Sequence, residues 1–226
     1  MSKFKGYQDA EVKRTLCKDI ELLYPYEITL PDPPKAEDII NYGIPIEQQF
    51  FKRIEQPKKL IELNSLEDVK EARRRLLAND DLSSWVDELW DILENGQWQY
   101  IRGVPTFITG DYLRYLSFNK IDTGLPLYRS SDMDKAQWWE FCIKKNPYCF
   151  GGIEMTRRRV GKSYFAGMFG LSSSTNGYGR NFGIQSKEDK SAMDFFRKCV
   201  RNPLKSYPFY LRPHSSTDIN TKGNRI

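Results

Sequence analysis

The stretch Arg157-Arg158-Arg159-Val160-Gly161-Lys162-Ser163 decides the expected fold of this chain of 226 residues. An apolar run over residues 148–155 precedes it, and a second apolar run over residues 164–169 follows it. This order predicts a strand, a tight loop and a helix, with Gly-Lys-Ser at the turn. Backbone N–H groups at such a helix start attract an anion, and the helix dipole adds to the attraction. The stretch therefore predicts a loop that binds a nucleoside triphosphate.

Each residue type in this loop has an expected role. Lys162 would reach the β- and γ-phosphates, and the Ser163 hydroxyl would ligate Mg²⁺. Gly161 would let the backbone approach the phosphates closely. The usual pattern has a glycine five residues before Gly161, whereas this chain has Thr156 there. The alternative is a basic helix start whose arginines face water. The candidate cofactor-binding residues of the loop are Thr156, Arg157, Arg158, Arg159, Val160, Gly161, Lys162 and Ser163.

The composition predicts a globular, intracellular protein. Hydrophobic residues make up 39% of the chain and aromatic residues 14%, which is more than disordered chains carry. No apolar run reaches the roughly 20 residues of a membrane span. The opening residues, 1–6, lack the apolar core of a signal peptide. We therefore expect a cytoplasmic protein without a membrane partner.

The four cysteines and the single histidine argue against a structural zinc site. They are Cys17, Cys142, Cys149, Cys199 and His214. No two cysteines have the C-x-x-C spacing, so neither a structural zinc site nor a Cys/His catalytic pair is expected. The expectation is that the cysteines are buried free thiols in a reducing compartment.

The net charge of +5 is unevenly distributed along the chain. Residues 156–226 hold 14 lysines and arginines against 4 acids, whereas residues 1–155 hold 21 against 26. The basic part begins at the phosphate-binding loop. Such a surface suits the phosphates of a nucleotide or of a nucleic acid, and the alternative is a solvated basic face without a partner.

Three segments are expected along the chain. Residues 1–60 form a proline-rich extended leader with short helices over 9–16 and 46–54, and residues 61–125 form a mainly helical subdomain. Residues 126–226 form the start of a nucleotide-binding domain. In the middle segment, Ser65 begins a capping box before a first helix. A second helix begins at Ser83 or Ser84 and stops at Gly96. A strand over 97–101 then ends in a turn at Arg102-Gly103. The tryptophans Trp85, Trp90 and Trp98 are expected in the core.

The second half of the chain is predicted as α/β. One helix is expected to begin at residues 109–111. Another, capped by Ser131, is expected to run to about Lys145. After the phosphate-binding loop, a helix runs from Lys162 to about Ser173, a short strand covers 181–185, and a helix capped by Ser186 runs from Lys187 to about Val200. Strand, helix, strand and helix in this order predict a parallel sheet.

This order of features resembles the ATPase domain of phage large terminases, the motors that package DNA into capsids. Four stretches between residues 97 and 213 carry the resemblance. They are Gly110-Asp111-Tyr112-Leu113-Arg114-Tyr115-Leu116, Tyr128-Arg129-Ser130-Ser131-Asp132, Arg158-Arg159-Val160-Gly161-Lys162-Ser163, and Asn181-Phe182-Gly183-Ile184-Gln185-Ser186-Lys187 with the segment up to Pro213. The third is similar to the family's deviant Walker A motif, which has an arginine three residues before its Gly-Lys.

The resemblance implies a P-loop NTPase-type parallel sheet, preceded by a mainly helical extension, that binds ATP and Mg²⁺. Lys162 and Arg158 would be catalytic, because charge on the transferred phosphoryl group must be neutralised. Ser163 would hold Mg²⁺, and Tyr128 and Arg129 would lie near the adenine, although Tyr128 could instead be a loop aromatic that covers the core. The implied partners are double-stranded DNA, the portal and the small terminase subunit, in a ring of identical subunits. The implied place is the host cytoplasm, at the capsid portal.

One departure from the family concerns the acid that activates water. ATP hydrolysis needs an apolar strand that ends in Asp-Glu, and the acids after Ser163 are Glu188, Asp189, Asp194 and Asp218, none of which follows such a strand. We therefore expect the front part of a motor, truncated before its Walker B strand and nuclease domain. Two alternatives remain: a basic module that binds DNA or a partner without nucleotide chemistry, and another P-loop enzyme such as a helicase-like ATPase or a small kinase.

Overall fold

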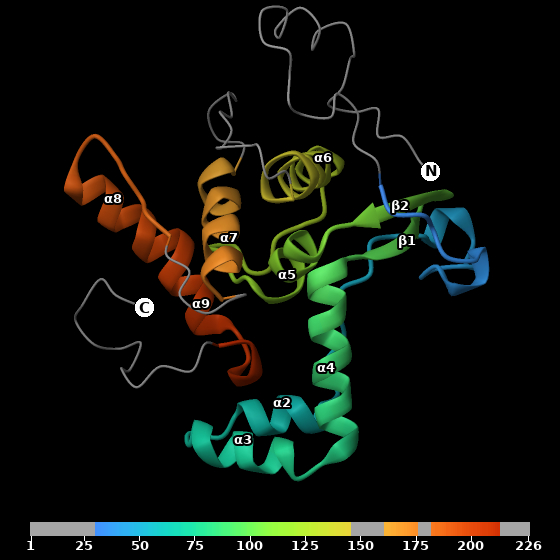
Figure 1. Cartoon of the computed structure of the whole chain (residues 1–226), viewed down its shortest axis with the longest axis horizontal. Coiled ribbons are helices and arrows are strands. Elements are labelled where there is room, and N and C mark those ends of the chain that lie inside the picture. Colours follow the sequence, from blue (N-terminus) through green and yellow to red (C-terminus); the bar gives the residue numbers. More distant parts are fainter. Residues whose placement is uncertain (1–29, 146–160, 176–181, 213–226) are drawn as a thin grey trace, which may run out of the picture. The chain divides into compact units, whose positions relative to one another are not determined.

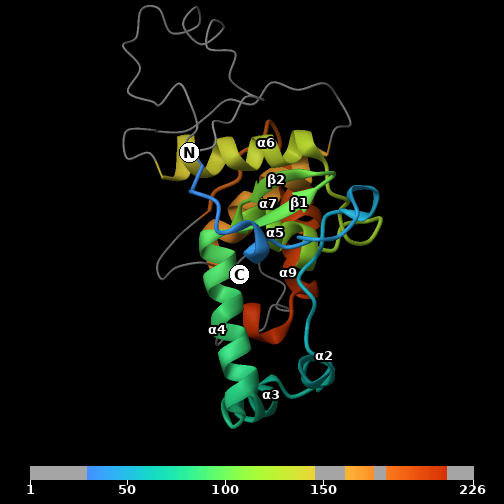
Figure 2. The same ribbon diagram turned by 90° about the vertical axis from the view of Figure 1, so that its right-hand side faces the viewer.

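The computed structural model describes residues 30–145, 161–175 and 182–212. Over these ranges the chain is α/β and mainly helical, with one small sheet (Figure 1 and Figure 2). Its regular elements are α2 (Lys58–Asn64), α3 (Val69–Leu77), α4 (Asp80–Asn95), β1 (Gln97–Ile101), β2 (Val104–Ile108), α5 (Gly110–Phe118), α6 (Ser130–Trp138), α7 (Lys162–Thr175), α8 (Asp189–Phe195) and α9 (Asn202–Ser206). Short 3₁₀ turns lie at η1 (Ala36–Asp38), η2 (Ile46–Gln48) and η5 (Phe209–Leu211), and the π-helical stretches η3 (Trp139–Lys144) and η4 (Phe196–Arg201) continue α6 and α8. None of the described helices is both long and apolar enough to cross a membrane.

The chain divides into two compact units, each built from three separate segments. Unit 1 consists of Met1–Arg53, Ile92–Leu113 and Tyr128–Met155, and unit 2 consists of Ile54–Asp91, Arg114–Leu127 and Thr156–Ile226. Each unit is described by itself below. The segments 1–60, 61–125 and 126–226 stay a prediction about folding domains.

The hairpin of β1 and β2 organises unit 1. The strands are antiparallel, with Gln97 opposite Ile108 and Ile101 opposite Val104. Two consecutive left-handed residues, Arg102 (φ 50) and Gly103 (φ 80), make the tight turn between them, as a type I′ hairpin requires. The strand and turn predicted over residues 97–103 are thus confirmed.

Two amide side chains attach the segment before the hairpin to it. Asn41 donates from Nδ2 to the carbonyl oxygens of Phe50 (2.8 Å) and Tyr100 (3.0 Å). The buried Gln49 accepts the backbone N–H of Gly103 at its Oε1 (2.7 Å). These side chains replace backbone pairing where the segment has no regular structure.

The helix predicted over residues 46–54 is wrong, because only η2 is helical there. The carbonyl of Gln49 accepts the N–H of Arg102 (3.0 Å) instead of continuing a helix. Contacts with the hairpin therefore outweigh the local helical pattern.

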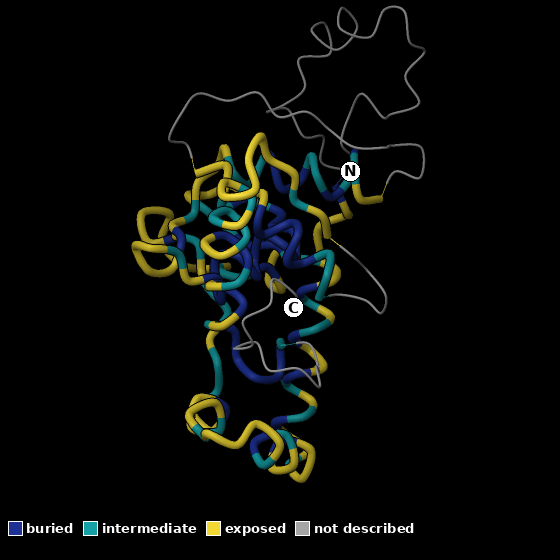
Figure 3. The backbone as a smooth tube through the Cα atoms, turned by 90° about the vertical axis from the view of Figure 1, so that its left-hand side faces the viewer, coloured by how far each residue is buried: buried dark blue, intermediate teal, exposed yellow. Residues whose placement is uncertain are grey.

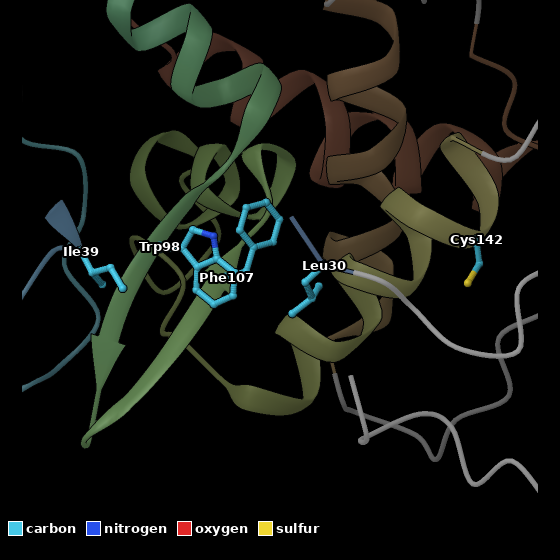
Figure 4. Close-up of a cluster of buried hydrophobic side chains, with 5 residues drawn as sticks. All are labelled: Leu30, Ile39, Trp98, Phe107 and Cys142. Atoms are coloured by element: carbon cyan, nitrogen blue, oxygen red, sulfur yellow. The ribbon is translucent and has the colours of Figure 1, made fainter. Parts of the chain in front are cut away.

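A cluster of buried apolar side chains forms a core in unit 1 (Figure 4). Its members are Leu30, Ile39, Trp98, Phe107 and Cys142. Trp98 and Phe107 lie opposite each other on the two strands, with ring centroids 5.5 Å apart. Burial of each large side chain contributes roughly 2 kcal/mol, so the hairpin is stabilised mainly by this face. Trp98 is a core residue as predicted, whereas Trp85 and Trp90 are half-buried.

A buried ionic network holds the start of α5 in unit 1. The Lys144 Nζ lies 3.4 Å from Asp111 Oδ2 and 3.0 Å from Glu140 Oε2, and Lys145 lies 3.2 Å from Glu140 Oε1. Both carboxylates are almost fully buried. Burial alone would lower the pKa of Lys144, but the two carboxylates raise it above its usual value. Each buried charge thus has a partner, as its desolvation requires.

In unit 2, α7 packs closely on η4. Gly167 lies so near Cys199 that a Cβ at this position would be 2.4 Å from the Cys199 carbonyl oxygen. Tyr115 of α5 meets Phe165 of α7 edge to face, with centroids 5.9 Å apart. Arg114 donates to the Thr175 hydroxyl at the other end of α7 (2.8 Å). Figure 3 shows burial along the backbone, with buried segments in dark blue. Residues 107–119 are buried without a break.

The last described segment of unit 2 is tied to α2 and α4. The N–H of Phe209 bonds to Asn64 Oδ1 (2.9 Å), and the Tyr210 hydroxyl lies 2.9 Å from Gln56 Oε1. The Tyr210 ring meets Trp85 edge to face, at 6.1 Å between centroids. The proline-rich end of the described chain is therefore packed rather than extended.

Several predicted helix starts differ from the structure by a few residues. Asp68, not Ser65, caps α3, because its carboxylate accepts the N–H of Lys70 (2.8 Å) and of Glu71 (3.4 Å). In the same way, the Asn79 side chain accepts the Leu82 N–H (3.1 Å), so α4 begins at Asp80 rather than at Ser83 or Ser84. In both cases the residue immediately before the helix provides the side-chain acceptor. The helices expected after Ser131 and Ser186 begin at Ser130 and Asp189.

The predicted parallel sheet is not supported, because the sheet found among the described residues is the antiparallel hairpin. The described part of the predicted strand, residues 182–185, has no strand structure. Its Phe182 ring packs over Gly170 of α7, where a Cβ would lie 2.1 Å from a ring carbon. The strand predicted over residues 148–155 and the helix predicted over residues 9–16 lie outside the described residues.

Gly110 provides a test of the packing at the start of α5. A Cβ there would lie 2.0 Å from the carbonyl oxygen of Leu93, which neither backbone can relieve without moving. We expect Gly110→Ala to lower the free energy of unfolding by about 2 to 3 kcal/mol, measured by urea denaturation. Gly183→Ala is the matched control, because nothing lies within 4 Å of its added Cβ. Equal stability of the two variants would contradict the packing.

Candidate functional site at the start of helix α7

The predicted Gly-Lys-Ser turn lies at the N-terminus of α7. Gly161 has a left-handed backbone (φ 82), with nothing within 4 Å of an added Cβ. Its carbonyl accepts the first helical bond, from the N–H of Phe165 (3.2 Å). The helix expected from Lys162 to about Ser173 is confirmed as Lys162–Thr175. The start of this 14-residue helix thus coincides with the motif.

The first turn of α7 is suited to hold an anion. Gly161, Lys162 and Ser163 are exposed. The cap residue is a glycine, so no side chain at that position accepts the N–H groups of the first turn, which the helix itself leaves without acceptors. Those N–H groups and the positive end of the helix dipole favour an anion there. The exposed ammonium of Lys162 and the hydroxyl of Ser163 add a cation and a metal-ligating oxygen, so these residues fit a Mg²⁺-bound phosphate.

Buried contacts on the rear of α7 hold this end in place. Seven residues of the helix are buried, from Phe165 to Ser172. Phe165 and Phe169 meet edge to face at 4.8 Å between centroids. Because the apolar side of α7 is fixed against its own unit, the exposed first turn is presented to solvent in one orientation.

The remaining predicted loop residues lie outside the described residues. They are Thr156, Arg157, Arg158, Arg159 and Val160. Their expected roles, including that of Arg158 in catalysis, stay predictions. The described half of the motif is Gly161, Lys162 and Ser163.

Tyr128 and Arg129, expected near the adenine, belong to unit 1, whereas Gly161–Ser163 belongs to unit 2. The Tyr128 ring stacks on Phe51, with centroids 5.4 Å apart and planes 11° apart, and meets Tyr112 at 6.1 Å. The Tyr112 hydroxyl accepts the N–H of Arg129 and donates to its carbonyl, both at 3.0 Å. Burial and the nearby Asp134 raise the pKa of Tyr128 to about 12. One face of Tyr128 is therefore covered by Phe51, as expected of a loop aromatic that packs on the core.

One acidic residue near α7 was missed in the sequence. Asp122, which follows α5, acts electrostatically on Tyr164, the third residue of α7. Burial and this carboxylate raise the pKa of Tyr164 to about 12 and the pKa of the Cys199 thiol to about 11. The candidate acids predicted from the sequence all follow Ser163, and no local pattern connects residue 122 with residue 164.

The three described acids after Ser163 do not form a catalytic group. Glu188 and Asp189 are exposed at the start of α8, and Asp194 pairs with Arg197 at 2.6 Å. Asp218 lies outside the described residues. Among the described residues there is no group of three or more His, Cys, Asp or Glu side chains that could hold a metal ion. Cys142 and Cys199 are buried free thiols, as predicted.

Comparisons of the chain with protein-family models, with curated proteins and with solved structures found no match.

The two interpretations of Tyr128 lead to different results for two variants. If its ring only packs between Phe51 and Tyr112, Tyr128→Ala should cost about 1 to 3 kcal/mol of unfolding free energy and leave nucleotide affinity unchanged. Tyr128→Phe should be nearly neutral, because the hydroxyl contacts the Met133 sulfur (3.3 Å), a weak acceptor. Urea denaturation and calorimetric titration measure both quantities. A selective loss of nucleotide affinity in Tyr128→Ala, at full stability, would instead favour the adenine contact.

Proposed function

We propose that the start of α7 binds the phosphates of a nucleoside triphosphate. The observation that carries the proposal is the exposed Gly161-Lys162-Ser163 at the start of a 14-residue helix, with Gly161 in a left-handed conformation. Glycine at this position lets the backbone N–H groups approach an anion, and the lysine adds a compact positive charge. Serine immediately after the lysine is placed to ligate the Mg²⁺ that accompanies the phosphates.

The larger activity we propose is that of a viral DNA-packaging motor, in which ATP hydrolysis moves double-stranded DNA. This rests on the resemblance to large terminase ATPase domains, and a P-loop-type parallel sheet would have to involve residues outside those described. In that setting Arg158 and Lys162 would act on the transferred phosphoryl group, and the partners would be the portal, the small subunit and identical copies in a ring. The host cytoplasm, at the capsid portal, would be the place of action.

Substitution of Lys162 tests the nucleotide site directly. We expect Lys162→Ala to weaken binding of a non-hydrolysable Mg²⁺–ATP analogue by about 10- to 100-fold, the worth of one charge-assisted contact. Isothermal titration calorimetry on the full chain measures this. The matched control is Lys190→Ala, an exposed lysine of α8 in the same unit, which should change affinity less than about twofold.

Either of two results would contradict the proposed site. One is unchanged affinity in Lys162→Ala, and the other is no nucleotide binding by a folded parent chain. Thermal unfolding followed by circular dichroism shows whether each variant is folded.

A second candidate function is a basic module that binds nucleic acid through its phosphates. It is favoured by the exposed cations Lys187, Lys190, Arg197, Lys198 and Lys205 between residues 182 and 212 of unit 2. Contacts of this kind release counterions, so the affinity falls steeply with salt.

The salt dependence of DNA binding separates the two functions. If the basic surface binds DNA, the double variant Lys198→Ala/Lys205→Ala should reduce the slope of log affinity against log salt by about 1 to 2. Fluorescence anisotropy with a labelled duplex at several salt concentrations measures this slope. An unchanged slope would exclude these two lysines as phosphate contacts. Nucleotide should leave this binding unaffected in a module that lacks nucleotide chemistry.

A further inference from the structure

Between residues 41 and 50 of unit 1, the chain turns polar side chains inward and apolar side chains outward. Gln49 is 6% exposed, and its side-chain amide donates to the Ile44 carbonyl (2.7 Å) and accepts the N–H of Gly103 (2.7 Å). Asn41 donates to two backbone carbonyls, one in this segment and one in β1. Figure 1 shows the segment, in blue, beside the β1–β2 hairpin. Buried amides next to exposed apolar side chains reverse the usual distribution, and the segment therefore holds apolar groups in contact with water.

The exposed apolar residues of this segment and of the hairpin form one patch, which we call the loop surface. The Ile46 side chain lies over the hairpin turn, because a Cβ added at Gly103 would be 3.5 Å from its Cδ1. The Tyr42 ring lies beside the Tyr100 ring of β1, with centroids 6.3 Å apart. Each member of the patch is between 39% and 60% exposed. The loop surface consists of Tyr42, Ile44, Ile46, Phe50 and Val104.

The size of the loop surface suits an interface between proteins. Its five residues together expose roughly 500 Å², and a stable interface buries about 800 Å² on each partner. Apolar patches of this size on a single chain are often functional. The rest of the required area is available next to the patch, where further residues are exposed: Gly43, Pro45, Glu47, Gln48, Arg102 and Pro105.

Two opposite charges lie at the rim of the loop surface. Glu47 follows Ile46 directly, and Arg102 precedes Gly103 in the hairpin turn. Both are exposed, and neither belongs to an ion pair with another residue in the described ranges. A surface that carries one acid and one base is complementary to a copy of itself when a two-fold axis exchanges the two charges.

We propose that the loop surface joins two copies of this chain about a two-fold axis. Both copies then use the same surface, so Glu47 of each copy faces Arg102 of the other. The apolar side chains fill the centre of the contact, where aromatic and aliphatic anchors supply most of the binding free energy, and the charges lie at its rim. A strongly acidic or basic partner would place one of the two charges against its own sign, so a second copy matches this surface better.

The inference does not depend on the proposed nucleotide site. The loop surface lies in unit 1, whereas Gly161, Lys162 and Ser163 belong to unit 2. Association of the chain is measured without nucleotide, so its result leaves the outcome of the Lys162→Ala titration open.

A charge placed in the centre of the loop surface tests the apolar contact. We expect the full chain to dimerise with a dissociation constant in the range of about 1 to 100 μM, measured by sedimentation velocity over a concentration series. Ile46→Glu should weaken dimerisation by at least about 30-fold. The matched control is Leu77→Glu, because Leu77 of α3 is 74% exposed in unit 2, and this variant should change the constant less than about twofold. Circular dichroism shows whether each variant is folded.

Exchange of the two rim charges tests the two-fold arrangement. Glu47→Arg or Arg102→Asp alone would place like charges opposite each other and should weaken dimerisation about 5- to 10-fold at low salt. Aspartate is used at residue 102 because it tolerates the left-handed backbone there (φ 50). The double variant Glu47→Arg/Arg102→Asp restores opposite charges, so its dissociation constant should return to within about threefold of the parent value.

Three results would overturn the inference. The first is a folded parent chain that stays monomeric at about 100 μM, which would assign the loop surface to a different molecule. The second is a dimer that a folded Ile46→Glu variant leaves intact. The third is a double charge variant that dimerises no more tightly than either single variant, because the two charges would then not face each other across the contact.

Discussion

The unbroken burial of residues 107–119 is the constraint on which both units depend. Water does not reach this run, so its polar groups must find partners inside the protein. In unit 1, Asp111 pairs with Lys144. In unit 2, Arg114 donates to the Thr175 hydroxyl, and its guanidinium carbon lies over the Trp90 ring, 5.2 Å from the ring centroid. These requirements select which side chains η3, α4 and α7 must present to α5.

The same buried charges explain why these contacts specify the structure more than they stabilise it. The Coulomb attraction in a buried ion pair is largely offset by the cost of removing both ions from water. A mispaired arrangement would leave a charge without a partner, at a cost of several kcal/mol. Lys144, which joins Asp111 and Glu140, therefore admits few alternative positions for the end of the helix formed by α6 and η3. Apolar packing at Trp98 and Phe107 supplies the favourable free energy in unit 1.

Different parts of α7 pack against the rest of its unit and form the candidate site. The helix is positioned by its rear, where Gly167 approaches Cys199 and Phe165 meets Tyr115. That packing does not involve Lys162 or Ser163, so both residues at the start of the helix are exposed to solvent. A glycine cap gives the turn no competing side-chain acceptor.

Local features could be predicted from the sequence wherever a short stretch decides the structure. The type I′ turn at Arg102-Gly103, the end of α4 at Gly96 and the helix that follows the Gly-Lys-Ser turn depend on backbone preferences of a few residues. The predicted parallel sheet is not supported, the predicted helix over 46–54 is wrong, and the environment of Tyr128 could not be predicted, because long-range contacts override the local pattern at these places. Phe182 packs on Gly170, Gln49 bonds to the hairpin, and Phe51 covers Tyr128. The packing of Tyr115 of α5 against Phe165 of α7 belongs to the same class, because it joins residues 50 positions apart and residue spacing does not indicate it.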